Sequence, residues 1–82
     1  MEYKPIGKIS LPEEGCYYSS EGRSSPTIYV DKIDLFTGLL WYVPISGESF
    51  QDEHLINSYD RQRVTSISNF SHFTWIQWEK TN

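Results

Sequence analysis

Three residues of this 82-residue chain have the side chains of a nucleophilic site: Cys16, His54 and His72. A catalytic cysteine needs a thiolate that an adjacent imidazole or a helix N-terminus activates. Nothing in the spacing of these residues argues for an imidazole beside the thiol, and a free cysteine is most often a small buried apolar side chain. We therefore expect Cys16 to be structural, and we predict no catalytic residue.

Metal and acid–base chemistry lack their usual sequence patterns as well. A zinc site needs three or four ligands at a recognisable spacing, and one cysteine with two distant histidines does not supply it. Paired carboxylates can act as acid and base across a cleft, but Glu13–Glu14 and Asp52–Glu53 are adjacent in sequence and such residues usually face water. Phosphate-binding and nucleophile-elbow motifs do not occur. We expect no metal, no cofactor and no enzymatic activity.

Composition narrows the class of protein further. The chain carries a net charge of −4, whereas domains that bind nucleic acid normally carry a basic surface. A single cysteine excludes an intramolecular disulfide. The first residues contain no apolar signal-peptide core, and no run approaches the length of a membrane span. We expect a single domain over residues 1–82, located in the cytoplasm and without a membrane contact.

The choice of apolar residues favours strands over helices. Alanine, the best helix former, is absent, whereas β-branched and aromatic residues recur along the chain. The missing alanine, together with eight isoleucines and eleven serines, also fits an AT-rich coding sequence. This bias suggests a phage or another mobile element as the source.

The clearest structural unit is a hairpin over residues 27–45. Its first strand alternates imperfectly, which indicates a phase change or a bulge, and Gly38 can take the positive φ that the turn requires. Pro44 cannot donate a ladder hydrogen bond, so the second strand ends there or lies at an edge. The hairpin is the element around which we expect the remaining strands to pack.

The other predicted elements are shorter. We expect strands around residues 8–11, 15–20, 63–68 and 72–79, with a loop over 21–26. Residues near 49–59 have a capping-box spacing from Ser49 to Asp52 and an apolar stripe, which predict one short helix. The expected fold is mostly β (α+β). It is a small antiparallel sheet of five to six strands, curled or closed as an SH3-like half-barrel, with that helix on one face.

Thirteen aromatic residues must supply most of the core, yet several are adjacent or three apart in predicted strands. Large rings then point to both faces of the sheet, and one helix covers only one face. The uncovered rings should form an interaction surface. In the C-terminal strand, Phe73 and Trp75 should share one face, with Trp75 in the core and Trp78 facing a partner. The predicted partner-binding residues are Tyr17, Tyr18, Trp41, Tyr42 and Trp78.

These features favour a small non-enzymatic protein that binds another protein, with a homodimer as one arrangement. A phage or mobile-element factor that inhibits a host or defence protein would fit the composition. The alternative is a β-barrel module that stacks a ligand, a nucleotide or single-stranded nucleic acid on its aromatic rings. Arg61 and Arg63 would contact the anion, with Lys32 and Lys80 nearby in the same groove. The net negative charge makes this alternative the weaker one.

Overall fold

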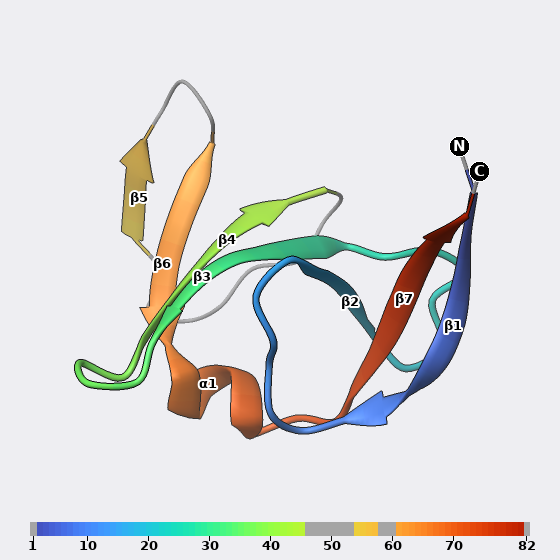
Figure 1. Ribbon diagram of the computed structural model, residues 1–82, viewed down its shortest axis with the longest axis horizontal. Helices are drawn as coiled ribbons and strands as arrows, with labels where there is room; N and C mark the ends of the chain where they lie inside the picture. The colour runs from blue at the N-terminus through green and yellow to red at the C-terminus, as the bar shows by residue number, and fades with distance from the viewer. Residues whose placement is uncertain (1, 46–53, 58–60, 82) are drawn as a thin grey trace.

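The strands form one antiparallel sheet, described here in a computed structural model over residues 2–45, 54–57 and 61–81 (Figure 1). The described part of the chain contains seven strands in the order β1-β7-β2-β3-β4-β6-β5 and one short helix, α1. The strands are β1 (Glu2–Ile9), β2 (Cys16–Ser20), β3 (Ile28–Asp34), β4 (Leu39–Pro44), β5 (His54–Asn57), β6 (Gln62–Ser66) and β7 (Trp75–Thr81). The sheet curls strongly but does not close, so the predicted mostly-β curled sheet is confirmed.

The central hairpin is confirmed in detail. β3 and β4 pair antiparallel, and their register shifts between Val30 and Lys32, which is the predicted bulge. Gly38 has a φ of 73°, and β4 ends at Pro44. β2 and the loop over 21–26 also lie where the sequence predicts them. A bulge increases the local twist of a strand, so this irregularity contributes to the curl of the sheet.

The predicted helix near 49–59 is wrong over residues 54–57, which form strand β5. β5 pairs antiparallel with β6, so the neighbouring strand decides the conformation of this segment and overrides its helical pattern. The seventh strand of the sheet therefore lies where the helix was expected. The capping pair Ser49 and Asp52 lies outside the described residues, as do 50–51, 53 and 58–60.

The helix that does form, α1 (Ile67–Ser71), follows β6 directly. Ser66 is its N-cap, and the Ser66 hydroxyl accepts a hydrogen bond from the Asn69 N–H at 3.2 Å. The strand predicted over 63–68 is therefore wrong beyond Ser66, because a serine cap converts the end of the strand into a helix start. Over the described ranges, none of the helices is long and apolar enough to cross a membrane.

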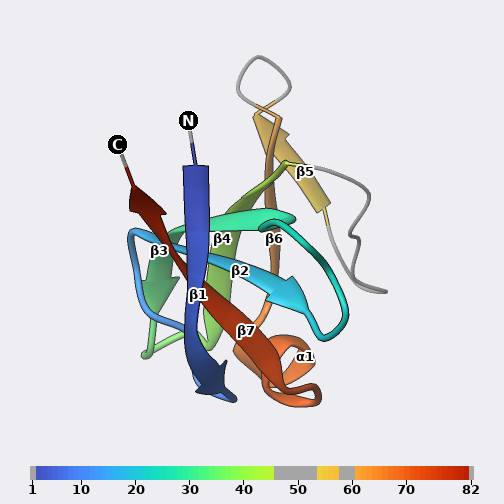
Figure 2. The same cartoon turned by 90° about the vertical axis from the view of Figure 1, so that its right-hand side faces the viewer.

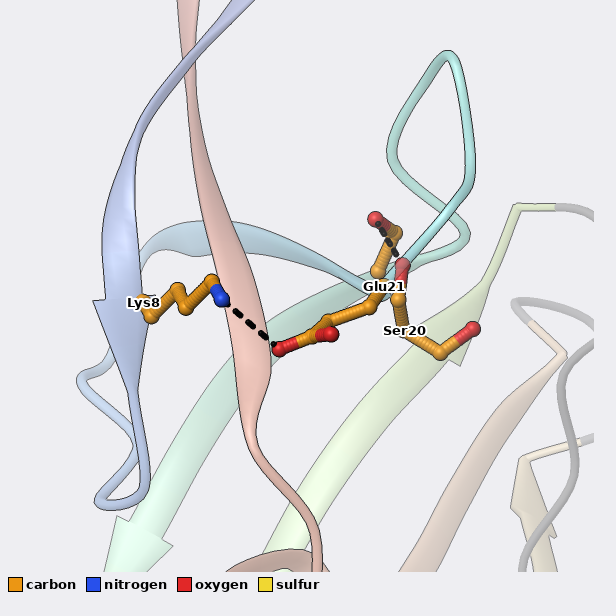
Figure 3. A network of polar contacts seen from close by, with 4 residues as sticks. Lys8, Ser20 and Glu21 are labelled. Atoms are coloured by element: carbon orange, nitrogen blue, oxygen red, sulfur yellow. Dashed lines mark hydrogen bonds and ion pairs between the residues drawn. The ribbon is translucent and has the colours of Figure 1, made fainter.

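The two ends of the chain lie side by side because β1 pairs with β7 (Figure 2). β1 is longer than the predicted strand over 8–11, and it accommodates Pro5 because it is an outer strand of the sheet. β7 lies between β1 and β2 and is hydrogen-bonded on both sides. Lys8 of β1 reaches across β7 to Glu21, with 3.1 Å between Nζ and Oε1 (Figure 3).

The core lies on the face of the sheet that α1 covers at one end. Phe70 of α1 is fully buried, and its ring stacks on Trp75 with centroids 4.6 Å apart. The same ring meets the edge of Tyr18 at 5.3 Å. Four further buried side chains from the hairpin complete this cluster: Ile28, Val30, Leu40 and Tyr42. The helix therefore inserts one aromatic ring between the two halves of the curled sheet.

Tyr18 links this core to the turn before β2. Its hydroxyl accepts a hydrogen bond from the Glu13 N–H at 2.8 Å, and burial raises the pKa of the phenol well above its usual value. The folded state therefore holds the phenolic proton more tightly than the unfolded state does. The stabilisation is complete below about pH 10, the usual pKa of tyrosine, and is lost as the pH rises above it.

We expect the free energy of unfolding to fall by about 1.4 kcal/mol for each pH unit above 10 on account of Tyr18. Urea denaturation at several alkaline pH values measures this slope. Tyr18→Phe keeps the ring and removes the titrating hydroxyl, so its slope should be shallower by that amount. Equal slopes for the two proteins would contradict the prediction.

Candidate functional site

Three of the five predicted partner-binding residues are not at the surface. Tyr18 and Tyr42 are fully buried in the core, and Trp78 is 6% exposed. The indole N–H of Trp78 donates to the Ser19 hydroxyl at 2.9 Å, on the face opposite the core cluster. The expectation that these three rings are exposed is therefore wrong, because Tyr18 and Tyr42 belong to the core cluster and Trp78 is buried on the other face of the sheet.

Tyr17 and Trp41 are half-buried and remain on the second face of the sheet. The rings of Tyr3, Tyr17 and Tyr29 form a row, with successive centroids 5.0 and 4.9 Å apart. Partial burial raises the pKa of Tyr17, and the neighbouring phenol of Tyr3 raises it further. In the hairpin, the Lys32 ammonium lies 4.9 Å from the centroid of the Trp41 ring. Most of this aromatic surface is therefore already in contact with other side chains.

Arg61 and Arg63, the residues predicted to contact an anion, lie close together, but the two lysines expected in the same groove are on strands that do not neighbour theirs. Arg63 is on β6, opposite Tyr42, and Arg61 lies in the turn before it with a positive φ of 58°. Lys80 is on β7, and three strands separate β7 from β6 in the sheet. Lys32 is on β3 and its ammonium lies over the Trp41 ring, so the four cations are spread over β3, β7 and the region of β6.

Cys16 and His72, two of the residues with potential nucleophilic chemistry, contact different groups. The Cys16 thiol lies 3.9 Å from Oε2 of Glu13 and 3.4 Å from Nε2 of Gln77. The His72 ring lies at the end of α1, with Nδ1 3.2 Å from the Ser68 carbonyl oxygen. The described residues contain no group of three or more histidine, cysteine or acidic side chains that could hold a metal ion. The side chain of His54 lies outside the described part of the chain.

A cleft of about 360 Å³ lies where β2 and β7 diverge. It is lined by Ile6, Gly15, Cys16, Tyr17, Gln77 and Trp78, with Glu79 and Lys80 beside them. Its volume is at the lower end of the range for small-molecule sites. Glu79 is paired with Lys4 at 3.8 Å, so the charges around the cleft are of both signs.

The most exposed apolar side chains lie instead at the hairpin tip, residues 34–39. Leu35 is 85% exposed and Phe36 is 98% exposed, although large apolar residues at the surface are normally scattered and partly covered. Leu39, the first residue of β4, adds a third exposed apolar side chain next to them. Figure 1 shows this tip projecting beyond α1. From sequence alone, Leu35 and Leu39 are expected in the strands of the hairpin and Phe36 in its turn, and none of them belongs to the predicted interaction surface.

The backbone of the hairpin tip is held by hydrogen bonds to Asp34. The Asp34 carboxylate accepts from the N–H groups of Phe36 at 2.9 Å and Thr37 at 3.4 Å. The Asp34 carbonyl accepts from the Gly38 N–H at 2.9 Å, and the positive φ of Gly38 completes the turn. Hydrogen bonds from the Thr37 side chain and the Phe36 backbone lower the pKa of Asp34 below its usual value.

The tip is also tied to the rest of the fold. The Gly38 carbonyl accepts from the N–H of Ile67, the first residue of α1, at 2.9 Å. Leu39 pairs with Ser66 in the ladder between β4 and β6. The tip is therefore a rigid loop that presents an uncovered leucine and phenylalanine in a defined geometry. A signal was available in the sequence, because turns are normally built from small and polar residues and this one contains Leu-Phe.

No protein-family model, no curated protein and no solved structure matches this chain.

Proposed function

We propose that this chain is a small non-enzymatic protein-binding protein and that it docks onto another protein through the hairpin tip. The observation that carries the proposal is the 98% exposure of Phe36 on a turn that Asp34 holds in place. Exposed apolar groups mark interaction sites, and a preorganised anchor avoids the entropy cost of ordering a loop on binding. The predicted aromatic interaction surface is thereby moved from the sheet face to the hairpin tip.

Burial of the exposed side chains at the tip would supply only part of the free energy that binding requires. Burying Leu35 and Phe36 would contribute about 1.5–3 kcal/mol each. A micromolar complex requires about 8 kcal/mol. The two side chains therefore act as the centre of an interface whose rim must add the remainder. Leu39 and the half-buried Trp41 lie on the same face of β4 and can extend the contact toward the sheet.

A finer proposal concerns the partner and its compartment. The alanine-free, AT-rich composition supports a phage or mobile-element accessory factor that acts in the cytoplasm. Its partner would then be a host or defence protein, which the bound chain inhibits stoichiometrically. The cleft between β2 and β7 supports the alternative, a small ligand held next to Tyr17 and Trp78. The mixed charges around that cleft and the burial of Trp78 make the hairpin tip the better candidate.

Phe36→Ser tests the proposed function. The partner is captured from a lysate of the producing cell, purified, and titrated against the wild-type chain and the variant. A central anchor of this kind is worth about 2–4 kcal/mol, so we expect affinity to fall about 30- to 1000-fold. The free energy of unfolding should change by less than about 0.5 kcal/mol, because the side chain is almost fully exposed.

Phe73→Ser is the matched control. Phe73 is 63% exposed and follows α1 instead of belonging to the hairpin tip, so its loss should leave affinity unchanged. Equal binding by wild type and Phe36→Ser would contradict the proposal. A change in tryptophan fluorescence on adding a nucleotide, unaffected by Phe36→Ser, would favour the cleft and the alternative function.

A further inference from the structure

The carboxylates along the hairpin indicate which kind of protein surface the partner presents, an inference that rests on the proposed function. Three carboxylates lie along the hairpin and beside it, those of Glu14, Asp31 and Asp34. Within the described residues each accepts a hydrogen bond from a neutral donor. Glu14 accepts from the Ile33 N–H at 2.7 Å, and Asp31 accepts from Nε2 of Gln62 at 2.6 Å. These contacts fix the carboxylates in position without cancelling their charge.

The one cation of the hairpin, Lys32, offsets only part of this charge, through its attraction to Asp34. Lys32 is the one basic residue of the hairpin, and its ammonium is placed over the Trp41 ring. The neighbouring helix α1 has no acidic residue in its first turn and no basic residue in its last turn. The hairpin and the residues beside it therefore carry three fixed carboxylates against one ammonium, with Asp34 within the tip, Glu14 next to it at Ile33 and Asp31 farther along β3.

We infer that the partner presents a preformed apolar pocket for Phe36 and that lysine or arginine side chains surround this pocket. The apolar side chains would supply the centre of the interface, and the carboxylates of Glu14, Asp31 and Asp34 would meet basic groups at its rim. Complementary charges at a rim steer association and exclude wrong partners, which is the contribution that two apolar anchors alone lack.

The same carboxylates argue against two other binding partners of the tip, a membrane surface and a second copy of the chain. An anionic membrane surface attracts basic segments, so it would repel a tip flanked by carboxylates. A second copy of the chain carries the same net charge of −4 and the same acidic hairpin, so tip-to-tip pairing would place like charges together. A protein with a basic rim is the occupant that both the apolar and the charged groups of the tip match.

Two isosteric variants test the contribution of the carboxylates to binding separately from that of Phe36. Glu14→Gln and Asp31→Asn each remove a charge while keeping an oxygen that can accept the existing hydrogen bond. We expect the double variant to bind the captured partner about ten-fold more weakly at low salt and to keep the thermal midpoint of wild type. For wild type, raising the salt from about 0.05 M to about 0.5 M should also cost about ten-fold, and this dependence should flatten in the double variant.

The contact itself is located with a photoreactive benzoylphenylalanine at position 36 of the full chain. Illumination with the captured partner should give a cross-linked partner peptide next to lysine or arginine residues, and the yield should fall with salt.

Loss of binding in Phe36→Ser with full binding by the charge variants would overturn the basic rim and leave the proposed function standing. Full binding by Phe36→Ser and by the charge variants would overturn both. Cross-linking to a second copy, or sedimentation with phosphatidylcholine vesicles with or without phosphatidylserine, would also overturn the inference.

Discussion

Trp75→Ala is expected to lower the free energy of unfolding by about 3–5 kcal/mol. Trp75 is 3% exposed, its ring stacks on Phe70 at an interplanar angle of 11°, and its indole N–H donates to the Phe70 carbonyl at 2.8 Å. The substitution leaves a cavity beside Phe70 and removes the hydrogen bond that ties β7 to α1. A chain of 82 residues has about 4–12 kcal/mol of total stability, so much of the population should unfold.

Urea denaturation followed by circular dichroism measures the effect. Phe73→Ala removes a ring only two residues away and should change stability by less than about 0.5 kcal/mol, because that ring faces water. A loss of less than about 1 kcal/mol for Trp75→Ala would mean that the stack with Phe70 is not part of the core.

The sequence predicts correctly those parts of the fold whose conformation depends on residues close together in the chain. The hairpin over residues 27–45 follows from alternation, from Gly38 at the turn and from Pro44 at the end of the second strand. The placement of Trp75 in the core was also predicted, and it is confirmed. These features depend on side chains within a few residues of one another, so no knowledge of the remaining chain was needed.

The errors come from pairings between distant segments. Residues 54–57 become a strand because β6 offers them a partner, which no local pattern reveals. The insertion of β7 between β1 and β2 joins residues at opposite ends of the chain. From sequence alone, a place near the C-terminus beside Gln77, Glu79 and Lys80 favours a surface position for Trp78. In the sheet it has Pro5 opposite on one side and Tyr17 on the other.

The candidate site could be predicted only in part, for a related reason. An interaction surface built from apolar and aromatic side chains was predicted as a class, but its position depends on which faces the folded sheet covers. The Tyr3–Tyr17–Tyr29 row covers part of the sheet face, and Trp78 is buried opposite Tyr17 in the ladder between β2 and β7. The Leu-Phe turn remains uncovered because it projects past α1. That direction is a property of the whole fold.

Trp78→Ala distinguishes the folded arrangement from the sequence-based expectation most sharply. If Trp78 faced a partner, its removal would leave the free energy of unfolding almost unchanged. Because the ring is buried and its N–H is paired with Ser19, we instead expect a loss of about 3–5 kcal/mol. The measurement is again urea denaturation. Trp41 is a half-buried tryptophan on the same sheet face, so Trp41→Ala should lower the free energy of unfolding by less than Trp78→Ala does.

The hydrogen bond between Trp78 and Ser19 can be separated from the packing of the ring. Ser19 is fully buried, accepts from the indole at 2.9 Å and donates to the Ser20 carbonyl at 3.0 Å. Ser19→Ala would leave a buried N–H unpaired, at a cost of about 1–3 kcal/mol. Trp78→Phe with Ser19→Ala removes both partners and should cost less than the sum of the single changes. Additive losses would mean that the two side chains do not interact, and β7 would then be held in the sheet by its backbone pairing and ring packing alone.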